Sequence, residues 1–102
     1  MDKYKVVVSK TATSMLVAHA SFLAKVSVQA AERLTGEFKR TANSLSAMPQ
    51  RNPWLIADYI PKHQYRYLPF EKRYLIIYQI IDKTVYIDYV LDCRQDYTWL
   101  LK

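Results

Sequence analysis

The spacing of apolar residues changes along this chain, and the changes divide it into strand-like and helix-like segments. Residues 4–9 centre on three consecutive valines and predict a first β-strand. After Ser9 and Thr11, either of which can cap a helix, apolar side chains recur at helical spacing to about residue 26. Ser27 then predicts the cap of a second helix, from residue 28 to about residue 47. Since only a residue or two separate them, the two helices are expected to form an antiparallel hairpin.

Three prolines follow the second helix and predict an ordered but irregular crossover. They are Pro49, Pro53 and Pro61. The apolar stretch Trp54-Leu55-Ile56 is expected to hold this crossover against the core. Gly36, the only glycine, falls inside the second helix, where it costs about 1 kcal/mol relative to alanine. We therefore expect a close helix–helix or helix–sheet contact at Gly36.

Three tyrosine-rich, β-branched segments occupy the next part of the chain, and the two short charged breaks between them predict the turns of an antiparallel meander. The strands are predicted at residues 62–70, 74–81 and 84–92. In the last strand an alternating set of apolar residues is expected to face the helix hairpin, because an uncovered set would be an exposed apolar patch. These residues are Val85, Ile87, Tyr89 and Leu91. Residues 96–101 predict a short terminal helix.

The predicted order of elements is β-α-α-β-β-β. It indicates an α+β fold in which the helix hairpin packs on a mainly antiparallel four-stranded sheet. The 102 residues are 51% hydrophobic and contain no linker-like or low-complexity stretch, so we expect a single domain over residues 1–102.

Several classes of site are excluded by residue counts. One glycine cannot build a glycine-rich phosphate loop, and one cysteine can form neither an internal disulfide nor a zinc cluster. The two histidines, His19 and His63, show no metal-ligand spacing, so no metal or cofactor is expected. No run approaches the roughly twenty apolar residues of a membrane helix, and the first residues do not resemble a signal peptide. The expected location is the cytoplasm.

Charge gives the first indication of function. The net charge of +6 and the pI of about 9.5 favour an anionic partner, although the same charge also promotes solubility. Arg66 and Arg94 are the main candidates, because a guanidinium group stays charged and matches phosphate or carboxylate oxygens. We expect both at the rim of the meander, where together they would stabilise the charge that develops in phosphodiester cleavage.

Other residues near these arginines extend the candidate site. His63 has a pKa suited to a general base, and Tyr97 is a further catalytic candidate. The residues expected to contact nucleic acid or another target are Lys62, Arg51, Tyr65 and Tyr67. Structural roles are the alternative: Arg66 as a strand residue facing solvent, Arg94 paired with a neighbouring aspartate, and His63 as a surface histidine.

The order and spacing of short segments resemble the RelE/ParE toxin superfamily of bacterial type II toxin–antitoxin systems over nearly the whole chain. The segments are Ser9 with Ala12, Ser27 with Ala30-Ala31, Leu45 with Pro49-Gln50-Arg51, Tyr65-Arg66-Tyr67-Leu68, Tyr78-Gln79-Ile80-Ile81-Asp82, and Asp92-Cys93-Arg94-Gln95-Asp96. The resemblance implies a toxin that a cognate, acidic antitoxin neutralises, as a homodimer or a hetero-oligomer with that antitoxin and without a membrane partner.

Two targets are implied by the resemblance. RelE-like members cleave mRNA on the ribosome with a set of basic residues, whereas ParE-like members poison DNA gyrase. Arg66 and Arg94 match basic positions of the nuclease branch, but Leu68, Leu75 and Leu100 stand where that branch has basic residues and a tyrosine. The resemblance therefore leans to the ParE-like side. The alternatives are a ribosome-dependent mRNA endonuclease and a degenerate, non-toxic module that only binds antitoxin.

Overall fold

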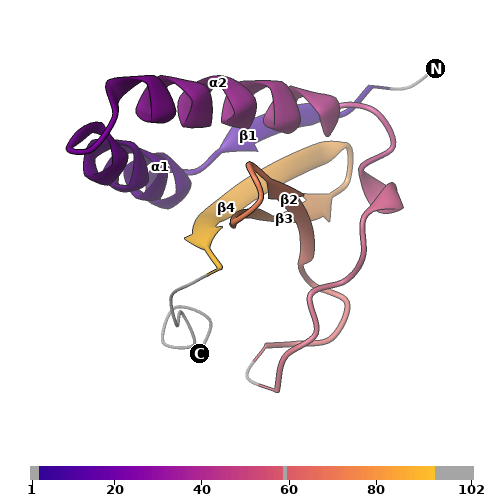
Figure 1. Ribbon diagram of the computed structural model, residues 1–102. Helices are drawn as coiled ribbons and strands as arrows, with labels where there is room; N and C mark the ends of the chain where they lie inside the picture. Colours follow the sequence, from indigo (N-terminus) through magenta and orange to yellow (C-terminus); the bar gives the residue numbers. More distant parts are fainter. Residues whose placement is uncertain (1–2, 59, 94–102) are drawn as a thin grey trace.

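A computed structural model describes residues 3–58 and 60–93 of the chain. A helix hairpin lies across one face of a four-stranded sheet (Figure 1), as expected from the sequence. The elements are β1 (Lys5–Val8), α1 (Lys10–Ala24), α2 (Val28–Ser44), the short 3₁₀ helix η1 (Pro49–Arg51), β2 (Arg66–Phe70), β3 (Tyr74–Ile81) and β4 (Thr84–Asp92). The predicted terminal helix at residues 96–101 lies outside the described residues.

The sheet has the strand order β1-β4-β3-β2. β1 runs parallel to β4, with Val6 opposite Val85, whereas β2, β3 and β4 form the predicted antiparallel meander. β2 is an edge strand, and it contains Pro69, a residue that edge strands tolerate because one side of the strand needs no ladder hydrogen bond. The α+β fold is therefore confirmed, with one parallel pair in an otherwise antiparallel sheet.

Serine caps set the start of both helices. The Ser9 hydroxyl accepts a hydrogen bond from the Ala12 N–H at 3.0 Å, and the Ser27 hydroxyl accepts one from the Ala30 N–H at 3.1 Å. Ser9, and not Thr11, is thus the first cap. Both helices end earlier than predicted, at Ala24 and at Ser44. Capping signals at helix starts are specific, whereas helix ends fray and carry weaker sequence signals.

The core lies between the hairpin and the sheet. Its largest fully buried members include Leu34 and Leu45 from the α2 side and Ile76, Tyr78, Val85, Ile87 and Val90 from the sheet. The predicted face of β4 is correct for Val85 and Ile87, but Val90 joins them in place of Tyr89. A register shift at Ile77/Tyr78 is the cause: Tyr78 pairs with Ile87 and Ile77 pairs with Tyr89, which leaves Asp88 as an extra residue. Such a β-bulge turns the following side chains to the opposite face.

The crossover between η1 and β2 runs along the free edge of β2. The Leu55 N–H donates to the Tyr65 carbonyl at 2.7 Å, and the Tyr67 N–H donates to the Pro53 carbonyl at 3.2 Å. Trp54 forms a β-bridge with Arg66. This pairing covers backbone groups that an edge strand would otherwise present to other chains.

Two expectations about single residues are wrong. Ile56 is 68% exposed, so Trp54 and Leu55 attach the crossover without it. A Cβ added at Gly36 would meet no atom within 4 Å, so this glycine allows no close approach of another element. The backbone freedom of Gly36 lowers the stability of α2, and no close packing contact compensates for this loss.

Candidate functional site

Arg66 lies at the start of β2, where its guanidinium group is bound by the crossover. Its Nη1 donates to the Asn52 carbonyl at 2.6 Å and to the Gln50 carbonyl at 3.0 Å, and its Cζ lies 3.7 Å from the centre of the Trp54 ring. Its Nε is buried and has no hydrogen-bond partner among the described residues. The side chain therefore joins β2 to the crossover and does not simply face solvent.

Arg51 likewise donates hydrogen bonds within the chain, next to the end of α2. Its Nη1 donates to the Ala47 carbonyl at 2.6 Å and to the Met48 carbonyl at 3.1 Å, and its Nη2 donates to the Ser44 hydroxyl at 3.1 Å. Ala47 and Met48 follow the end of α2, and Nη1 also lies 3.4 Å from the carbonyl of Ser44, the last residue of the helix. The last carbonyls of a helix lack intrahelical partners, and a cationic side chain is well suited to satisfy them. Arg51 is nevertheless an exposed residue, close in sequence to the crossover that binds Arg66.

His63, Lys62 and Tyr67 lie around the same crossover. His63 adopts a left-handed φ of 61°, which interrupts extended backbone, so β2 begins at Arg66 and not at residue 62 as predicted. The His63 ring centre lies 5.1 Å from that of Trp54, and Lys62 is exposed. Tyr67 lines a shallow apolar hollow of about 290 Å³ together with Trp54, Leu55, Ile56 and Leu75. The structure thus brings His63, Arg66 and Tyr67 to Trp54, whereas the hydrogen bonds of Arg51 go to Ser44, Ala47 and Met48.

Tyr65 belongs to the sheet face that the hairpin leaves uncovered. Its ring centre lies 6.2 Å from that of Tyr89, beside the bulge residue Asp88. The Asp88 carboxylate accepts a hydrogen bond from the Gln79 amide at 2.6 Å. Burial, followed by the charge of Asp88, raises the pKa of Tyr65 to about 12. At neutral pH this phenol is therefore a hydrogen-bond donor and not a base.

Alkaline titration should reveal this environment. The unfolded chain releases the Tyr65 proton near pH 10, whereas the native chain holds it to about pH 12, so stability contributed by Tyr65 is complete below pH 10 and falls above it. The phenolate difference spectrum should lose a late-titrating component in Tyr65→Phe, and Asp88→Asn should shift that component to lower pH. An unchanged late component in Tyr65→Phe would contradict the assignment.

Arg94 and Tyr97 lie outside the described residues, so their convergence with Arg66 stays a prediction. The last described residue, Cys93, donates its N–H to the Arg73 carbonyl at 2.7 Å, beside the turn between β2 and β3. Asp92, the residue before Cys93, pairs with Tyr74 at the start of β3, whereas Arg66 pairs with Tyr78 near its other end. Four residues of a strand span about 13 Å. Cys93 and Arg66 therefore lie towards opposite ends of the sheet.

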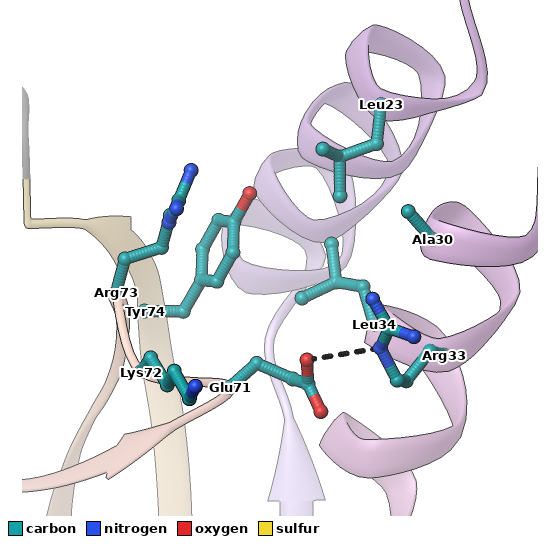
Figure 2. A pocket seen from close by; sticks show the side chains of 8 residues that line it. All are labelled: Leu23, Ala30, Arg33, Leu34, Glu71, Lys72, Arg73 and Tyr74. Atoms are coloured by element: carbon teal, nitrogen blue, oxygen red, sulfur yellow. Dashed lines mark hydrogen bonds and ion pairs between the residues drawn. The ribbon is translucent and has the colours of Figure 1, made fainter. Parts of the chain in front are cut away.

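A second basic site, absent from the sequence-based candidates, lies between the hairpin and the β2–β3 turn (Figure 2). It is a pocket of about 490 Å³. Its lining residues are Leu23, Ala30, Arg33, Leu34, Glu71, Lys72, Arg73 and Tyr74. Leu23 and Leu34 point toward one another, and Tyr74 faces them from the strand side. Arg33 Nε lies 3.4 Å from Glu71 Oε2 and forms the pair drawn in Figure 2.

Sequence reasoning missed this pocket because its cations come from two places that look ordinary in isolation. Arg33 reads as the polar side of an amphipathic helix, and residues 71–73 read as a charged turn. One signal was available, since the turn has charged residues where glycine or asparagine is usual. Glu71 and Lys72 indeed have left-handed φ values of 49° and 66°.

In residues 3–58 and 60–93, no group of three or more His, Cys, Asp or Glu side chains is placed to hold a metal ion. Neither of the two α-helices found there is long and apolar enough to cross a membrane.

Comparisons with known proteins give a consistent picture. The profile of a family described as "ParE toxin of type II toxin-antitoxin system, parDE" matches residues 6–97. A solved structure described as "Chromosomal ParDE TA system from P. aeruginosa" matches with a TM-score of 0.72 and 11% sequence identity, over 88% of this chain and 96% of that chain. At such low identity the structural likeness establishes the fold alone. No curated protein matches the chain.

Proposed function

Because this chain belongs to the ParE toxin family of type II toxin–antitoxin systems, we propose that it arrests growth by binding a macromolecular target and that a cognate antitoxin neutralises it. DNA gyrase is the first candidate for the target, since the ParE-like side of the superfamily is associated with gyrase. The cytoplasm, where gyrase acts, is the proposed location.

The observation that carries this proposal is the set of contacts that the Arg66 guanidinium group makes within the chain. RNA cleavage by charge stabilisation needs arginine donors aimed at the reacting phosphate. In this chain Nη1 of Arg66 is directed at two backbone carbonyls, and the group stacks on Trp54. A donor already engaged in this way must break its bonds to the crossover before it can bind a phosphate. A protein target that binds elsewhere on the surface leaves these bonds in place.

The opposing hypothesis is ribosome-dependent mRNA cleavage, with His63, Arg94 and Tyr97 as its remaining catalytic candidates. Among these only His63 is described, and its ring lies against Trp54. Basic side chains next to the crossover, Lys62 and Arg51, would then contact RNA. No described contact favours this hypothesis over target binding.

A supercoiling assay tests the proposed target. Purified chain is added to gyrase and relaxed plasmid, and relaxation by topoisomerase I serves as the specificity control. We expect loss of supercoiling with unaffected relaxation, and recovery when the antitoxin from the reading frame next to the chain's own gene is added. Full gyrase activity at saturating toxin would contradict the gyrase proposal.

Expression of the lone chain in cells tests toxicity itself. Growth arrest is expected, and co-expression of the antitoxin should relieve it. Normal growth with abundant folded chain would instead favour the degenerate, antitoxin-binding module.

A further inference from the structure

The sheet face turned away from the hairpin, called the open face below, carries an apolar layer of its own (Figure 1). Side chains alternate between the two faces of a strand. Since Tyr74 and Ile76 belong to the core beneath the hairpin, Leu75 and Ile77 lie on the open face. Residues paired across neighbouring strands share a face, so the register places two apolar rows there. The apolar rows are Pro69, Leu75 and Leu91, and Tyr67, Ile77 and Tyr89.

The apolar rows continue into the shallow hollow at the crossover. Its lining residues are Trp54, Leu55, Ile56, Tyr67 and Leu75, and none of these is charged. Ile77 is fully buried whereas Ile56 is 68% exposed, so the layer is closed at its centre and open at the crossover. At about 290 Å³ the hollow lies at the lower limit of small-molecule sites, which measure about 300–1,000 Å³ and present convergent polar groups. Apolar side chains of a peptide segment fit such a hollow better than a small polar ligand does.

The chain leaves the sheet beside these rows. Cys93 follows Leu91 by two positions, and its N–H donates to the carbonyl of Arg73, two positions before Leu75. The crossover, paired with the edge of β2, lies three strand spacings from β4, which is about 14 Å. Residues 94–102 follow Cys93, and nine residues of extended chain span up to about 30 Å. The segment after β4 is therefore long enough to turn back across the open face and reach the hollow.

The sequence of this segment matches the surface that it can reach. Three polar residues come first, at positions 94–96, and allow the chain to turn away from β4. Four of the next five residues are apolar or aromatic: Tyr97, Trp99, Leu100 and Leu101. Removing such side chains from water drives their packing against other apolar surface. A segment tethered close to its site also binds at an effective concentration in the millimolar range, so even weak contacts hold it there.

A second copy of the chain is the alternative occupant of the hollow. Each copy carries a net charge of +6, and like charges oppose association. Stable interfaces between proteins bury about 1,200–2,000 Å² in total, and Ile77 and Leu91 of the apolar rows are already buried and add little area. The tethered segment faces neither obstacle.

We propose that residues 97–101 fold back over the open face as a strap, with their apolar side chains in the hollow and against the apolar rows. The strap joins the exit of β4 to the crossover before β2. Tyr67 and Tyr89 then lie beneath peptide and are not available to stack on bases, which is how aromatic side chains bind single-stranded RNA. The strap is a property of the chain itself and does not depend on the antitoxin or on the identity of the target.

Fluorescence of Trp54 tests whether the strap covers the hollow, because the chain contains only two tryptophans. In Trp99→Phe, Trp54 is the only tryptophan, and the strap should shield it from acrylamide. A chain shortened after Asp96 also keeps only Trp54, and its emission should shift to longer wavelength and be quenched more strongly. Equal spectra and equal quenching in these two folded chains would overturn the proposal.

Disulfide trapping locates the strap in the full-length chain and decides the question if the shortened chain does not fold. Cys93→Ser removes the native thiol, and Ile56→Cys with Leu101→Cys then places one thiol at the hollow and one in the strap. Val17→Cys with Leu101→Cys is the matched control, because Val17 is 57% exposed on α1, across the other face of the sheet. The Ile56 pair should form its intramolecular disulfide about tenfold faster or more, since docking raises the effective concentration. Equal rates for the two pairs would contradict the strap.

Dilution separates the strap from a second copy. Acrylamide quenching of Trp54 in Trp99→Phe is measured over a wide range of protein concentration, together with sedimentation. An intramolecular strap shields Trp54 equally at every concentration. Shielding that disappears as dimers dissociate would assign the hollow to a second copy of the chain and overturn the proposal.

Discussion

Replacing Arg66 with methionine is expected to lower the free energy of unfolding by about 2–4 kcal/mol. The variant loses hydrogen bonds from a charged group to the Gln50 and Asn52 carbonyls and the stacking on Trp54. In a domain of this size such a loss lowers the melting temperature by about 10 °C or more. Urea unfolding followed by circular dichroism measures the change.

Conservative and matched variants sharpen this test. Arg66→Lys keeps the charge but not the planar group, so it should lose about half as much stability. Lys62→Met removes an exposed cation just before β2 and should change stability by less than about 0.5 kcal/mol. A stable, fully folded Arg66→Met that has lost toxicity would show that Arg66 acts on the target, contrary to its proposed role in the fold.

Removing the hydroxyl group of Tyr78 is expected to cost about 1–3 kcal/mol. Tyr78 is fully buried, and its hydroxyl donates to the Pro49 carbonyl at 2.6 Å and accepts from the Asn52 amide at 2.9 Å. In Tyr78→Phe both partners lose this bond in a place that water does not reach easily. Since Asn52 also presents its carbonyl to Arg66, the same substitution should loosen the crossover.

Equilibrium unfolding with a control at another tyrosine measures this effect. Tyr86 pairs with Gln79 on the sheet face away from the hairpin and is only partly buried, so Tyr86→Phe should change stability by less than about 0.5 kcal/mol. Hydrogen exchange of the Leu55 and Tyr67 amides, which pair the crossover with β2, should become faster in Tyr78→Phe. Equal stability of the two phenylalanine variants would contradict the role of the buried hydroxyl.

The elements of this fold were predictable because their signals are local. A serine placed before an apolar helical pattern accepts a bond from an N–H three residues later, and Ser9 and Ser27 both do so. The strands of the meander are separated by short charged turns, and alternation within β4 correctly places Val85 and Ile87 in the core. Such features depend on residues within one or two turns of each other.

The details that failed depend on residues far apart in the chain. The bulge at Asp88 is fixed by the register between β3 and β4, and no alternation within β4 alone indicates it. The contacts of Arg66 arise because the crossover, 14 to 16 residues earlier in the chain, is folded back along the edge of β2. From the sequence, Arg66 therefore looked like a free cation at a strand end.

The candidate site also combines features that local sequence signals indicated with contacts between distant residues that they did not. Sequence reasoning grouped Arg66 and Arg94 with Lys62, His63, Arg51 and Tyr97. Of these, the structure brings Arg66 and His63 to the Trp54 ring. The sequence did not show that the guanidinium groups of Arg51 and Arg66 donate hydrogen bonds to backbone carbonyls. The pocket of Arg33, Lys72 and Arg73 combines a helix face with a turn 38 or more residues away, so only the folded chain reveals it.

The central claim is that this toxin acts by binding and does not cut RNA. Mapping mRNA 5′ ends after induction of the lone chain tests it most directly. The account predicts growth arrest with no new ends inside translated codons. Cuts within codons that disappear in Arg94→Ala would contradict it and would establish the chain as a ribosome-dependent endonuclease.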